Sequence, residues 1–346
     1  MKTLKFAVLG TGFWSQFQVG AWCELPGVEL VALYNRTKSK AEDLAKRFNI
    51  PRVYDDAAEL FASEELDFVD IITDVDTHYK FVEMASDAGI KHIICQKPMA
   101  PDWETAKKLV KKCSEKRASL YIHENFRWQA PIRRFREIMD SGIIGKPFKA
   151  RVSFLSGFPV FDNQPFLKEL EHFILTDMGS HVLDICRYLF GEVDKLWCQT
   201  KTVNKKIKGE DVAVIMMEMA NGMPLYTEMS YASVVEHDMF STVNILVEGE
   251  KGSIALGPGS SFEIRTTTKN GTEYEKVKFP SFAWADPDYI VNHESGIHIN
   301  RDILNAILQK SKAENSGSDN LETVRLVWAS YDSAKTGKLI HLKDFN

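Results

Sequence analysis

The chain has 346 residues, with 43 lysines and arginines against 48 aspartates and glutamates, which gives a formal net charge of -5. This length predicts two domains of roughly 150 residues each, and without an excess of positive charge the chain is not expected to bind nucleic acid. The five cysteines are widely spaced and include no C-x-x-C pair. We therefore expect reduced thiols in a cytoplasmic protein, without disulfides or a structural zinc site. No apolar stretch approaches the ~18 residues of a membrane span, so no membrane partner is expected.

The first part of the chain alternates short apolar runs with amphipathic segments. The apolar runs are residues 6–9, 30–34, 68–72, 92–95 and 119–122. Segments with helical spacing lie between them, such as 38–48, 78–88 and 103–116. Strands that alternate with helices form a parallel sheet covered on both faces. We therefore predict a doubly wound α/β domain over residues 1–122.

The later part of the chain has a different pattern. Alternating apolar and polar residues occur at 149–155, 212–219, 225–231 and 243–248. Glycine-containing turns join several of these strands, as at Asn221-Gly222. One helix is predicted from about 176 to 190, with Gly191 as its C-terminal cap, and another from about 321 to 336. The second domain, residues 123–346, is therefore predicted to contain a large, mostly antiparallel sheet in an α/β fold.

A glycine turn, Gly10-Thr11-Gly12-Phe13-Trp14-Ser15, follows the first predicted strand. The first glycine permits a tight turn, and the second lets the backbone approach a pyrophosphate at the N-terminus of the next helix. Ser15 occupies the third glycine position of the G-x-G-x-x-G pattern. A lone G-x-G is more often an ordinary turn, but a strand comes directly before it and a second strand follows, which favours dinucleotide binding.

The second predicted strand ends at Asn35, where an acidic residue would accept hydrogen bonds from the adenosine ribose. No carboxylate at this position repels a 2′-phosphate, and Arg36 and its neighbours Thr37 and Lys38 can bind one. The local chemistry therefore leans towards NADP over NAD. The alternative is that these two cations are simply solvated surface residues.

Lys97 follows another apolar strand and directly precedes Pro98. Ligands of open parallel sheets bind at this end of the strands. An ammonium group there can polarise a substrate oxygen and lower the pKa of a neighbouring acid. The alternative is an exposed surface lysine, but the position favours a functional role.

Asp177, His181 and Asp184 lie on one face of the predicted helix. A histidine next to carboxylates can accept a hydroxyl proton near neutral pH, and a carboxylate fixes the orientation of its ring. Two alternatives remain open, a buried structural histidine and a metal site. The further candidate ligands for such a metal are His172, His293 and His298.

These motifs together resemble the glucose-fructose oxidoreductase and inositol dehydrogenase family, often called Gfo/Idh/MocA, over nearly the whole chain. Residues 73–78 are similar to the family segment T-P-x-x-x-H, with Asp74 in place of proline. Gln96-Lys97-Pro98 is similar to E-K-P, and residues 177–181 fit D-x-x-x-H. The remaining matches are residues 123–128 with an N-x-R segment, 142–147 with G-x-I-G-x-P, and 331–339 with a closing Y-x-S-A-x-x-G.

The resemblance implies a Rossmann domain followed by an α/β domain whose large open sheet often forms an oligomer interface, so we expect a homodimer or homotetramer. It implies a catalytic set of Lys97, Asp177 and His181 that needs no metal. The substrate-binding residues that it implies are Lys97, Arg127, Asp177 and His181. The implied cofactor-binding residues are Gly10, Thr11, Gly12, Phe13, Trp14, Asn35, Arg36, Thr73, Asp74, His78, Gln96, Lys97 and Asn125. Gln96 replaces the family glutamate and removes a negative charge beside Lys97, which can change the pKa of the lysine.

The predicted activity is an NAD(P)-dependent dehydrogenase acting on a monosaccharide, polyol or cyclitol. His181 removes the hydroxyl proton, Lys97 stabilises the developing alkoxide, Asp177 orients the set, and hydride passes to the nicotinamide. Oxidation of an aldose to its lactone is the preferred reaction. The alternatives are a sugar hydrolase or isomerase that recycles a tightly bound cofactor, a catalytically silent dinucleotide-binding regulator, and a metal-dependent enzyme.

Overall fold

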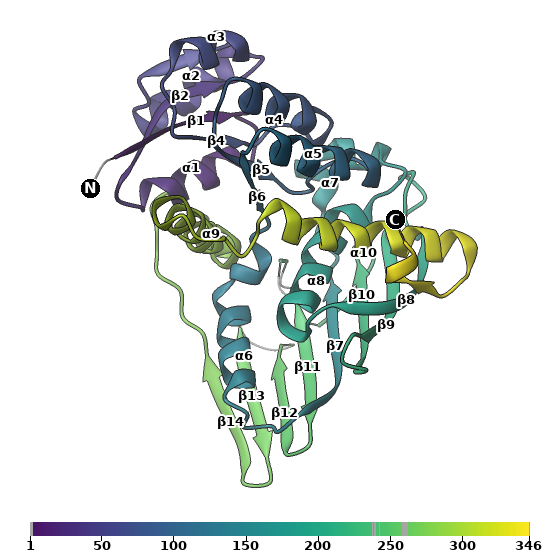
Figure 1. Ribbon diagram of the computed structural model, residues 1–346. Coiled ribbons are helices and arrows are strands. Elements are labelled where there is room, and N and C mark those ends of the chain that lie inside the picture. Colours follow the sequence, from purple (N-terminus) through teal and green to yellow (C-terminus); the bar gives the residue numbers. More distant parts are fainter. Residues whose placement is uncertain (1–2, 237, 239, 242, 258–261, 346) are drawn as a thin grey trace. The chain divides into compact units, whose positions relative to one another are not determined.

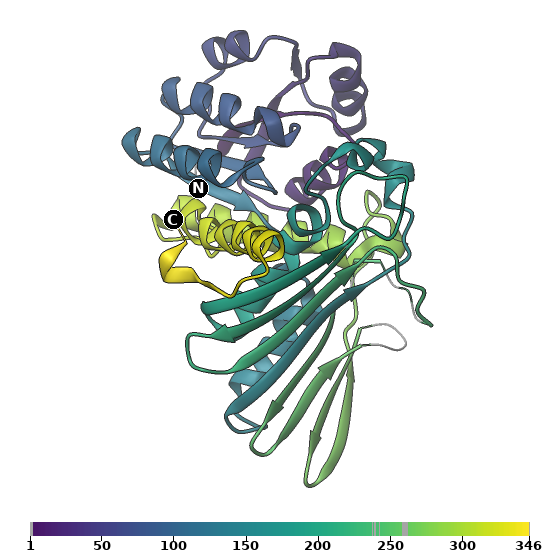
Figure 2. The same cartoon turned by 90° about the vertical axis from the view of Figure 1, so that its right-hand side faces the viewer.

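The computed structural model describes residues 3–236, 238, 240, 241, 243–257 and 262–345, and of Asn163 only the backbone. The chain divides into two compact units, whose elements are labelled in Figure 1 and can be followed from a second side in Figure 2. Unit 1 comprises residues 1–125 and 281–324, and unit 2 comprises residues 126–280 and 325–346.

Unit 1 contains a six-stranded parallel sheet with the order β3-β2-β1-β4-β5-β6. Its strands are β1 (Leu4–Leu9), β2 (Val28–Tyr34), β3 (Arg52–Tyr54), β4 (Phe68–Ile71), β5 (His92–Gln96) and β6 (Ser119–His123). The strand order reverses between β1 and β4. In open α/β sheets this reversal creates a ligand site at the carboxyl ends of the two strands. The predicted parallel sheet is confirmed.

The helices of unit 1 follow from local patterns in the sequence. They are α1 (Ser15–Cys23), α2 (Lys38–Phe48), α3 (Ala57–Ser63), α4 (His78–Asp87), α5 (Trp103–Glu115) and α9 (Ile290–Gln309), with the short 3-10 helices η1 (Val75–Thr77) and η4 (Pro287–Tyr289). Helix α2 buries Ala41, Leu44 and Ala45, which lie one turn apart on one face. Asp102 caps the start of helix α5, because its carboxylate accepts a hydrogen bond of 2.8 Å from the backbone N–H of Thr105.

Helix α9 belongs to unit 1 although it follows the whole large sheet in the sequence, and the sequence analysis did not predict it. It packs against α1; Gly296 of α9 lets the two helices approach closely, and Gly20 of α1 makes room for Trp284, which precedes α9. A Cβ at Gly296 would lie 3.2 Å from Cβ of Ala21, and one at Gly20 would lie 2.5 Å from the ring of Trp284. Residues 281–324 therefore belong to unit 1, whereas the predicted division placed them in the domain 123–346. The predicted boundary at residue 122 stays a prediction.

Unit 2 contains a nine-stranded sheet with the order β14-β13-β12-β11-β7-β10-β9-β8-β15. Its strands are β7 (Pro147–Leu155), β8 (Val193–Lys201), β9 (Val212–Met219), β10 (Pro224–Ser230), β11 (Asn244–Gly249), β12 (Gly252–Leu256), β13 (Glu263–Thr268), β14 (Gly271–Lys276) and β15 (Ile340–His341). Only the pairing of β7 with β10 is parallel among these strand pairs. The prediction of a large, mostly antiparallel sheet is confirmed.

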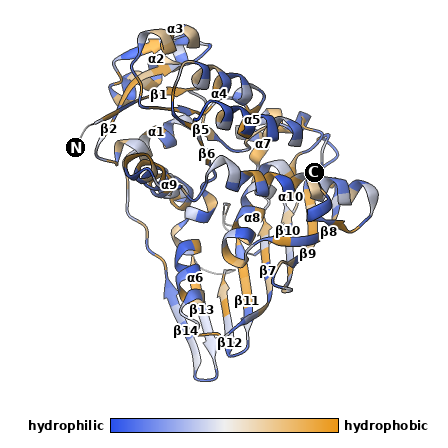
Figure 3. Cartoon of the chain, in the orientation of Figure 1, coloured by the Kyte–Doolittle hydropathy of each residue, from blue (hydrophilic) through white to orange (hydrophobic). Residues whose placement is uncertain are grey.

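Helices cover one face of this sheet. Unit 2 contains α6 (Ala130–Asp140), α7 (Val160–Asn163) and α8 (Ile174–Phe190), and the 3-10 helices η2 (Phe126–Trp128), η3 (Pro165–Glu169) and η5 (Leu342–Asp344). Helix α8 packs against β7, β9 and β10, and α6 against β12 and β13. Buried residues alternate along β9 and β11, as expected for a sheet with one covered face. Edge strand β14 is exposed throughout and hydrophilic to neutral in Figure 3.

Helix α10 (Gly317–Thr336) begins in unit 1 and ends in unit 2. Among the described residues, no helix combines the length and the hydrophobicity that crossing a membrane requires. All five cysteines are free; Cys23 is exposed, and the other four are buried.

Candidate active site

The glycine turn lies at the strand reversal of unit 1. Gly10 has a φ of +100°, and a Cβ there would lie 2.7 Å from the carbonyl carbon and oxygen of Ile72, at the end of β4. Only glycine fits this conformation and this space. At Gly12, in contrast, no atom lies within 4 Å of the position that a Cβ would take. Gly10 is therefore required by the fold itself, while Gly12 leaves room for a ligand to approach the backbone.

Thr11 and Asn35 connect the turn to the end of β2. The backbone N–H of Thr11 donates to Oδ1 of Asn35 at 3.4 Å, and Nδ2 of Asn35 donates to the carbonyl of Thr37 at 2.9 Å. The buried hydroxyl of Thr11 has no hydrogen-bond partner among the described residues. A buried polar group without a partner is costly, and a phosphate oxygen at the start of α1 is an acceptor of the required kind. These features fit a dinucleotide.

The other predicted residues of this loop differ in exposure. Phe13 is 56% exposed, and Trp14 is half-buried directly before α1. Arg36, beyond β2, and Asp74, beyond β4, are exposed. These four side chains therefore lie at the surface of unit 1, around the end of the sheet where the strand order reverses.

His78 links the two loops that follow β4 and β5. Its Nε2 lies 3.0 Å from the carbonyl oxygen of Thr73, and its Nδ1 lies 3.1 Å from that of Pro98. The ring is 1% exposed, and burial lowers its pKa. In this structure His78 contributes to the site through the loops of Thr73 and Pro98 that it joins.

Lys97 comes directly after β5, with its side chain half-buried. Its backbone N–H donates to Oε1 of Gln96 at 2.7 Å, so the preceding side chain fixes the peptide group that joins the two residues. Nε2 of Gln96 in turn donates to Oε1 of Gln18 in α1 at 2.7 Å. Gln96, which replaces the family glutamate, is thus hydrogen-bonded on both sides of its amide.

Asn125 ends the first segment of unit 1 and is 4% exposed. Its Nδ2 donates to Oγ of Ser295 at 2.7 Å and to the carbonyl of Asn292 at 3.3 Å. Helix α9 therefore holds Asn125, one of the cofactor-binding residues that the resemblance implies.

Helix α8 of unit 2 carries Asp177 and His181 one turn apart. The hydroxyl of Tyr231, beyond β10, donates to Oδ2 of Asp177 at 3.0 Å. The ring of Phe126 stacks on the imidazole of His181, with centroids 3.7 Å apart and planes 9° from parallel. His181 is 4% exposed. Both predicted catalytic side chains of this unit are therefore held in place by aromatic neighbours from other elements.

The start of α8 is capped by a carboxylate from a distant part of the chain. Oε1 of Glu210 accepts hydrogen bonds from the backbone N–H groups of Phe173 at 3.2 Å and Leu175 at 3.3 Å. The hydroxyl of Tyr331 donates to the same oxygen at 2.7 Å. A negative charge at this end also interacts favourably with the helix dipole, and so fixes the first turn of α8, in which Asp177 lies.

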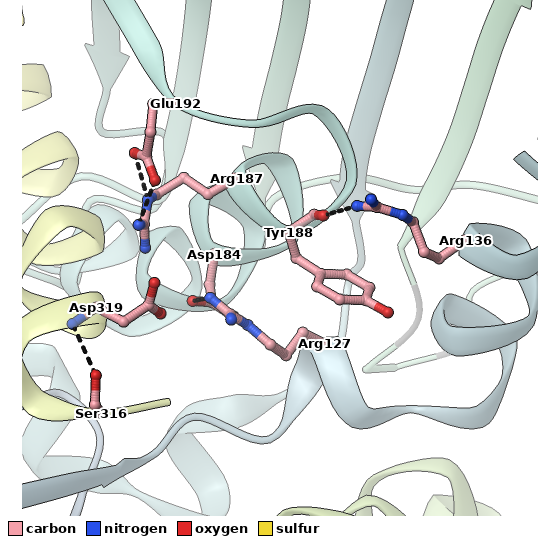
Figure 4. A network of polar contacts seen from close by, with 8 residues as sticks. All are labelled: Arg127, Arg136, Asp184, Arg187, Tyr188, Glu192, Ser316 and Asp319. Carbon is pink, nitrogen blue, oxygen red and sulfur yellow. Dashed lines mark hydrogen bonds and ion pairs between the residues drawn. The ribbon is translucent and has the colours of Figure 1, made fainter. Parts of the chain in front are cut away.

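Arg127 forms a buried ion pair with Asp184, as Figure 4 shows. Its Nε lies 2.7 Å from Oδ2 of the carboxylate, and one terminal nitrogen lies 2.5 Å from Oδ1. Asp184 has no exposed surface, and Arg127 is 5% exposed. The guanidinium predicted to bind substrate is therefore engaged by a carboxylate of α8. Asp184, which the sequence analysis placed beside His181, is engaged by the arginine.

The three further histidines considered as metal ligands lie in different places. His293 stacks on Phe17 at 3.8 Å, and burial lowers its pKa to about 4. His298 lies 3.5 Å from Glu294, and His172 lies against Tyr331. Within the described ranges, no group of three or more His, Cys, Asp or Glu side chains is arranged to hold a metal ion.

Each unit therefore contributes its own part of the predicted set. Unit 1 carries the glycine turn, Lys97 and Asn125, and unit 2 carries Asp177, His181 and Arg127. Sequence reasoning missed the residues that contact predicted site residues or the start of α8, which are Gln18, Phe126, Glu210 and Tyr231, and also Asp70 of β4, which accepts hydrogen bonds from Gln18. Of these only Asp70 gave a signal, as a lone carboxylate inside the apolar run 68–72.

Comparison with known proteins identifies the family. A model described as "Oxidoreductase family, NAD-binding Rossmann fold" matches residues 4–124, and one for the GFO/IDH/MocA C-terminal domain matches residues 132–255. A D-apiose dehydrogenase of Rhizobium rhizogenes is 39% identical over 342 residues, which cover 99% of this chain and 98% of that protein. A second D-apiose dehydrogenase, from Paraburkholderia graminis, is 38% identical over 343 residues, which cover 99% and 91%.

A solved structure agrees over the full length. The crystal structure of an oxidoreductase from Agrobacterium radiobacter, in complex with NAD+, L-tartaric acid and magnesium, has a TM-score of 0.95 and 38% identity and covers 99% of both chains. The chain therefore belongs to the GFO/IDH/MocA family of oxidoreductases, with an NAD-binding Rossmann fold in its N-terminal part.

Proposed function

We propose that this oxidoreductase is an NAD-dependent dehydrogenase of a small sugar, with D-apiose as the first substrate to test. The observation that carries the proposal is the placement of Lys97 directly after β5, in the same sheet whose strand order reverses at Gly10. Ligands of such sheets bind at the carboxyl ends of the strands, which is where an ammonium group can act on a bound substrate.

The residues have distinct roles in this proposal. When bound, NAD supplies the carbon that accepts the hydride. The buried imidazole of His181 accepts the proton of the substrate hydroxyl, because a neutral histidine is a suitable base near neutral pH. Asp177, held by Tyr231, orients the reacting groups. The ammonium of Lys97 stabilises the negative charge that develops on the substrate oxygen.

The choice of D-apiose rests on the two relatives of that name, which match nearly the whole chain at 39% and 38% identity. An aldose oxidised at its anomeric carbon would give a lactone, in agreement with the reaction preferred from the sequence. Arg127 supports this substrate site through Asp184 and α8, since the ion pair occupies its guanidinium.

For the cofactor we propose NAD, although Asn35 and Arg36 favoured NADP when the sequence alone was considered. Strand β3 ends next to β2, and Asp55 and Asp56 follow it directly. Burial is the main reason why the pKa of Tyr34 is raised; the charges of these two carboxylates raise it further, and the charge of Arg36 lowers it. Acidic groups near the end of β2 therefore offset part of the positive charge that binding of a 2′-phosphate requires.

We also propose a homodimer or homotetramer through the sheet of unit 2. Met216 of β9 is 59% exposed although it lies in the middle of a strand. A single exposed apolar side chain is normal on a protein surface, so the proposal rests mainly on the family resemblance, in which the large open sheet often forms an oligomer interface. Light scattering coupled to gel filtration measures the assembly, and a monomer at all concentrations would contradict it.

The proposed function is tested with the purified protein, D-apiose, other aldoses and inositols, each with NAD and with NADP. The readout is the absorbance of the reduced nicotinamide. We expect the highest kcat/KM with D-apiose and NAD. The proposal would be refuted if none of the sugars and cyclitols led to reduction of NAD or NADP.

A further inference from the structure

A chain of hydrogen bonds leads from the backbone of Lys97 into the core of unit 1. After Gln96 and Gln18, it ends at Asp70 in β4, because Nε2 of Gln18 lies 2.8 Å from both carboxylate oxygens of Asp70. Nε1 of Trp22 also donates to Oδ2 of Asp70 at 2.8 Å. Asp70 has no exposed surface, and Gln18 and Trp22 are each 1% exposed.

All hydrogen bonds in this chain point in one direction. Lys97 donates to Gln96, Gln96 donates to Gln18, and Gln18 donates to Asp70. Asp70 accepts hydrogen bonds from Gln18 and Trp22 and donates to neither, which is the pattern of an ionised carboxylate. Each amide in the chain therefore has its orientation set by the next one, and the carboxylate sets the last.

We infer that Asp70, acting through Gln18 and Gln96, positions Lys97 for the hydride-transfer reaction. The inference rests on the proposed function, in which Lys97 contacts the substrate. Oε1 of Gln96 holds the N–H of Lys97 and so fixes the backbone from which the lysine side chain extends. His78 holds the carbonyl of the next residue, Pro98, so the backbone is held on both sides of Lys97.

Protonation of Asp70 would reverse the donor-to-acceptor direction of these hydrogen bonds. A carboxylic acid must donate its proton, and the group in reach is the amide of Gln18, which has to turn its oxygen towards Asp70. Gln18 then presents its NH₂ to Gln96, whose amide must also turn. The NH₂ of Gln96 would finally face the N–H of Lys97, and two donors cannot form a hydrogen bond. Lys97 would lose the contact that fixes its backbone.

The surroundings of Asp70 bring this change close to neutral pH. Burial raises the pKa of Asp70 to about 7, while the hydrogen bonds from Trp22 and Gln18 oppose the increase. Cys95 of the adjacent β5 also interacts with Asp70, but burial keeps its thiol neutral by raising its pKa far above the ordinary value. On the side of β1, the paired residue is the apolar Val8. Asp70 therefore changes charge near pH 7.

Asp70→Asn imitates the protonated state without changing the shape of the side chain. The NH₂ of asparagine must donate to Gln18, which forces the same reversal and leaves the N–H of Lys97 without an acceptor. We expect kcat to fall on the order of 10-fold, the scale of one lost buried hydrogen bond. We also expect the decline of kcat below pH about 7 to disappear, because the variant remains in the reversed state at every pH.

A second substitution should restore the contact. In Asp70→Asn/Gln96→Glu, the reversed Gln18 donates to the carboxylate at position 96, and this carboxylate also accepts the N–H of Lys97. Every donor then has an acceptor again. We expect kcat to return to within about 3-fold of Gln96→Glu alone, which separates a positioning role from general damage to the core.

The matched control is Asp67→Asn, three residues earlier and directly before β4. Its carboxylate accepts the backbone N–H of Lys5 at 2.9 Å, at the opposite end of the parallel sheet from Lys97. This variant also loses one negative charge from the same segment. We expect its kcat, KM and pH profile to match those of the wild type.

A measurement without turnover completes the test. In protein labelled with ¹⁵N-lysine, the amide signal of Lys97, assigned with Lys97→Arg, should shift with a midpoint near pH 7 and remain at its low-pH position in Asp70→Asn. If Asp70→Asn does not fold, Gln96→Met replaces it, because this substitution removes both hydrogen bonds of Gln96. The pH titration of the Lys97 amide in the wild-type protein then still tests whether Asp70 is coupled to Lys97.

The outcomes separate the two proposals. A wild-type protein that oxidises no sugar refutes the proposed function, while the titration of the Lys97 amide still tests the network. A wild-type enzyme whose Lys97 amide does not titrate, or whose kcat is unchanged in Asp70→Asn, overturns the positioning role of Asp70. The inference holds if the Lys97 amide titrates, kcat falls in Asp70→Asn, and kcat of Asp70→Asn/Gln96→Glu comes within about 3-fold of that of Gln96→Glu alone.

Discussion

The hydroxyl of Tyr231 donates a hydrogen bond of 3.0 Å to Oδ2 of Asp177. Burial, and then the charge of Asp177, raise the pKa of this phenol far above its ordinary value, so it remains a donor at every pH of interest. Tyr231→Phe removes the hydrogen bond and keeps the ring. We expect kcat to fall by about 3- to 10-fold with little change in KM, because the substitution frees the orientation of Asp177. Steady-state kinetics measures both constants.

Tyr331→Phe is the matched comparison. This buried tyrosine also donates to a carboxylate, at 2.7 Å, but its partner is Glu210 at the start of α8. We expect a lower Tm, with a loss of about 1 kcal/mol in the free energy of unfolding, and a smaller effect on kcat than that of Tyr231→Phe. Equal kinetic effects of the two substitutions would contradict a specific role for Tyr231.

The two glycines of the turn should respond differently to alanine. Gly10→Ala forces a left-handed conformation and a contact of 2.7 Å with the carbonyl of Ile72, so we expect the free energy of unfolding to fall by at least about 1–3 kcal/mol. Gly12→Ala meets no atom within 4 Å. It should keep the wild-type Tm but raise the Kd for NAD by roughly 10-fold or more. Calorimetry gives both quantities, and a normal NAD affinity in Gly12→Ala would exclude the expected cofactor position.

The buried pair of Arg127 and Asp184 should be important for stability. Arg127→Met breaks the buried ion pair by removing one partner, which costs about 3–5 kcal/mol in the free energy of unfolding. The control is Arg134→Met on α6, because Arg134 is 42% exposed and pairs with Glu275, which is 46% exposed. There we expect a loss below about 1 kcal/mol. Urea unfolding distinguishes the two variants.

His123 should make the protein sensitive to acid. Its Nε2 donates to Oδ1 of Asn300 at 3.0 Å, its buried Nδ1 has no hydrogen-bond partner within the described part of the chain, and burial lowers its pKa to about 4. Between pH 6.5 and 4 the unfolded chain binds a proton that the folded chain does not. Stability therefore falls as pH decreases through this window, by up to roughly 3 kcal/mol at its lower end.

His123→Gln keeps a donor for Asn300 and removes the titrating ring. We expect its Tm to decrease less than the wild-type Tm between pH 7 and pH 5. The comparison isolates His123 because the other titrating groups are shared, including Asp70, whose raised pKa acts in the opposite direction. Parallel Tm profiles of the two proteins would show that His123 does not cause the acid sensitivity.

Much of the fold could be predicted because local patterns determine it. The amphipathic spacing of residues 38–48 predicted α2, and the alternation in 212–219 predicted β9, each with its observed bounds. Helix α9 could not be predicted in this way. It packs against α1, and 13 of its 20 residues are buried, including His293 and Asn300, so no polar face marks it as an amphipathic helix.

The site was predictable only where the chemistry is local. The glycine turn and Lys97 follow strands directly, and Asp177 and His181 are one helical turn apart. The supporting contacts join residues far apart in the sequence, such as Gln18 with Asp70, 52 positions away. A single sequence contains no record of such pairs, because they form only when α1 packs on the sheet.

The position of α9 in the sequence has a consequence for synthesis. Chains emerge from the ribosome with the N-terminus first, and domains tend to fold as they appear. The six strands of unit 1 are complete at residue 123. Trp284 and α9, which pack on α1, follow only about 160 residues later, after residues 126–280 of unit 2 have been synthesised. The side of α1 that packs against α9 and Trp284 therefore stays uncovered until these residues have been synthesised. We expect chaperones that bind exposed apolar surface to recognise the nascent unit during this interval.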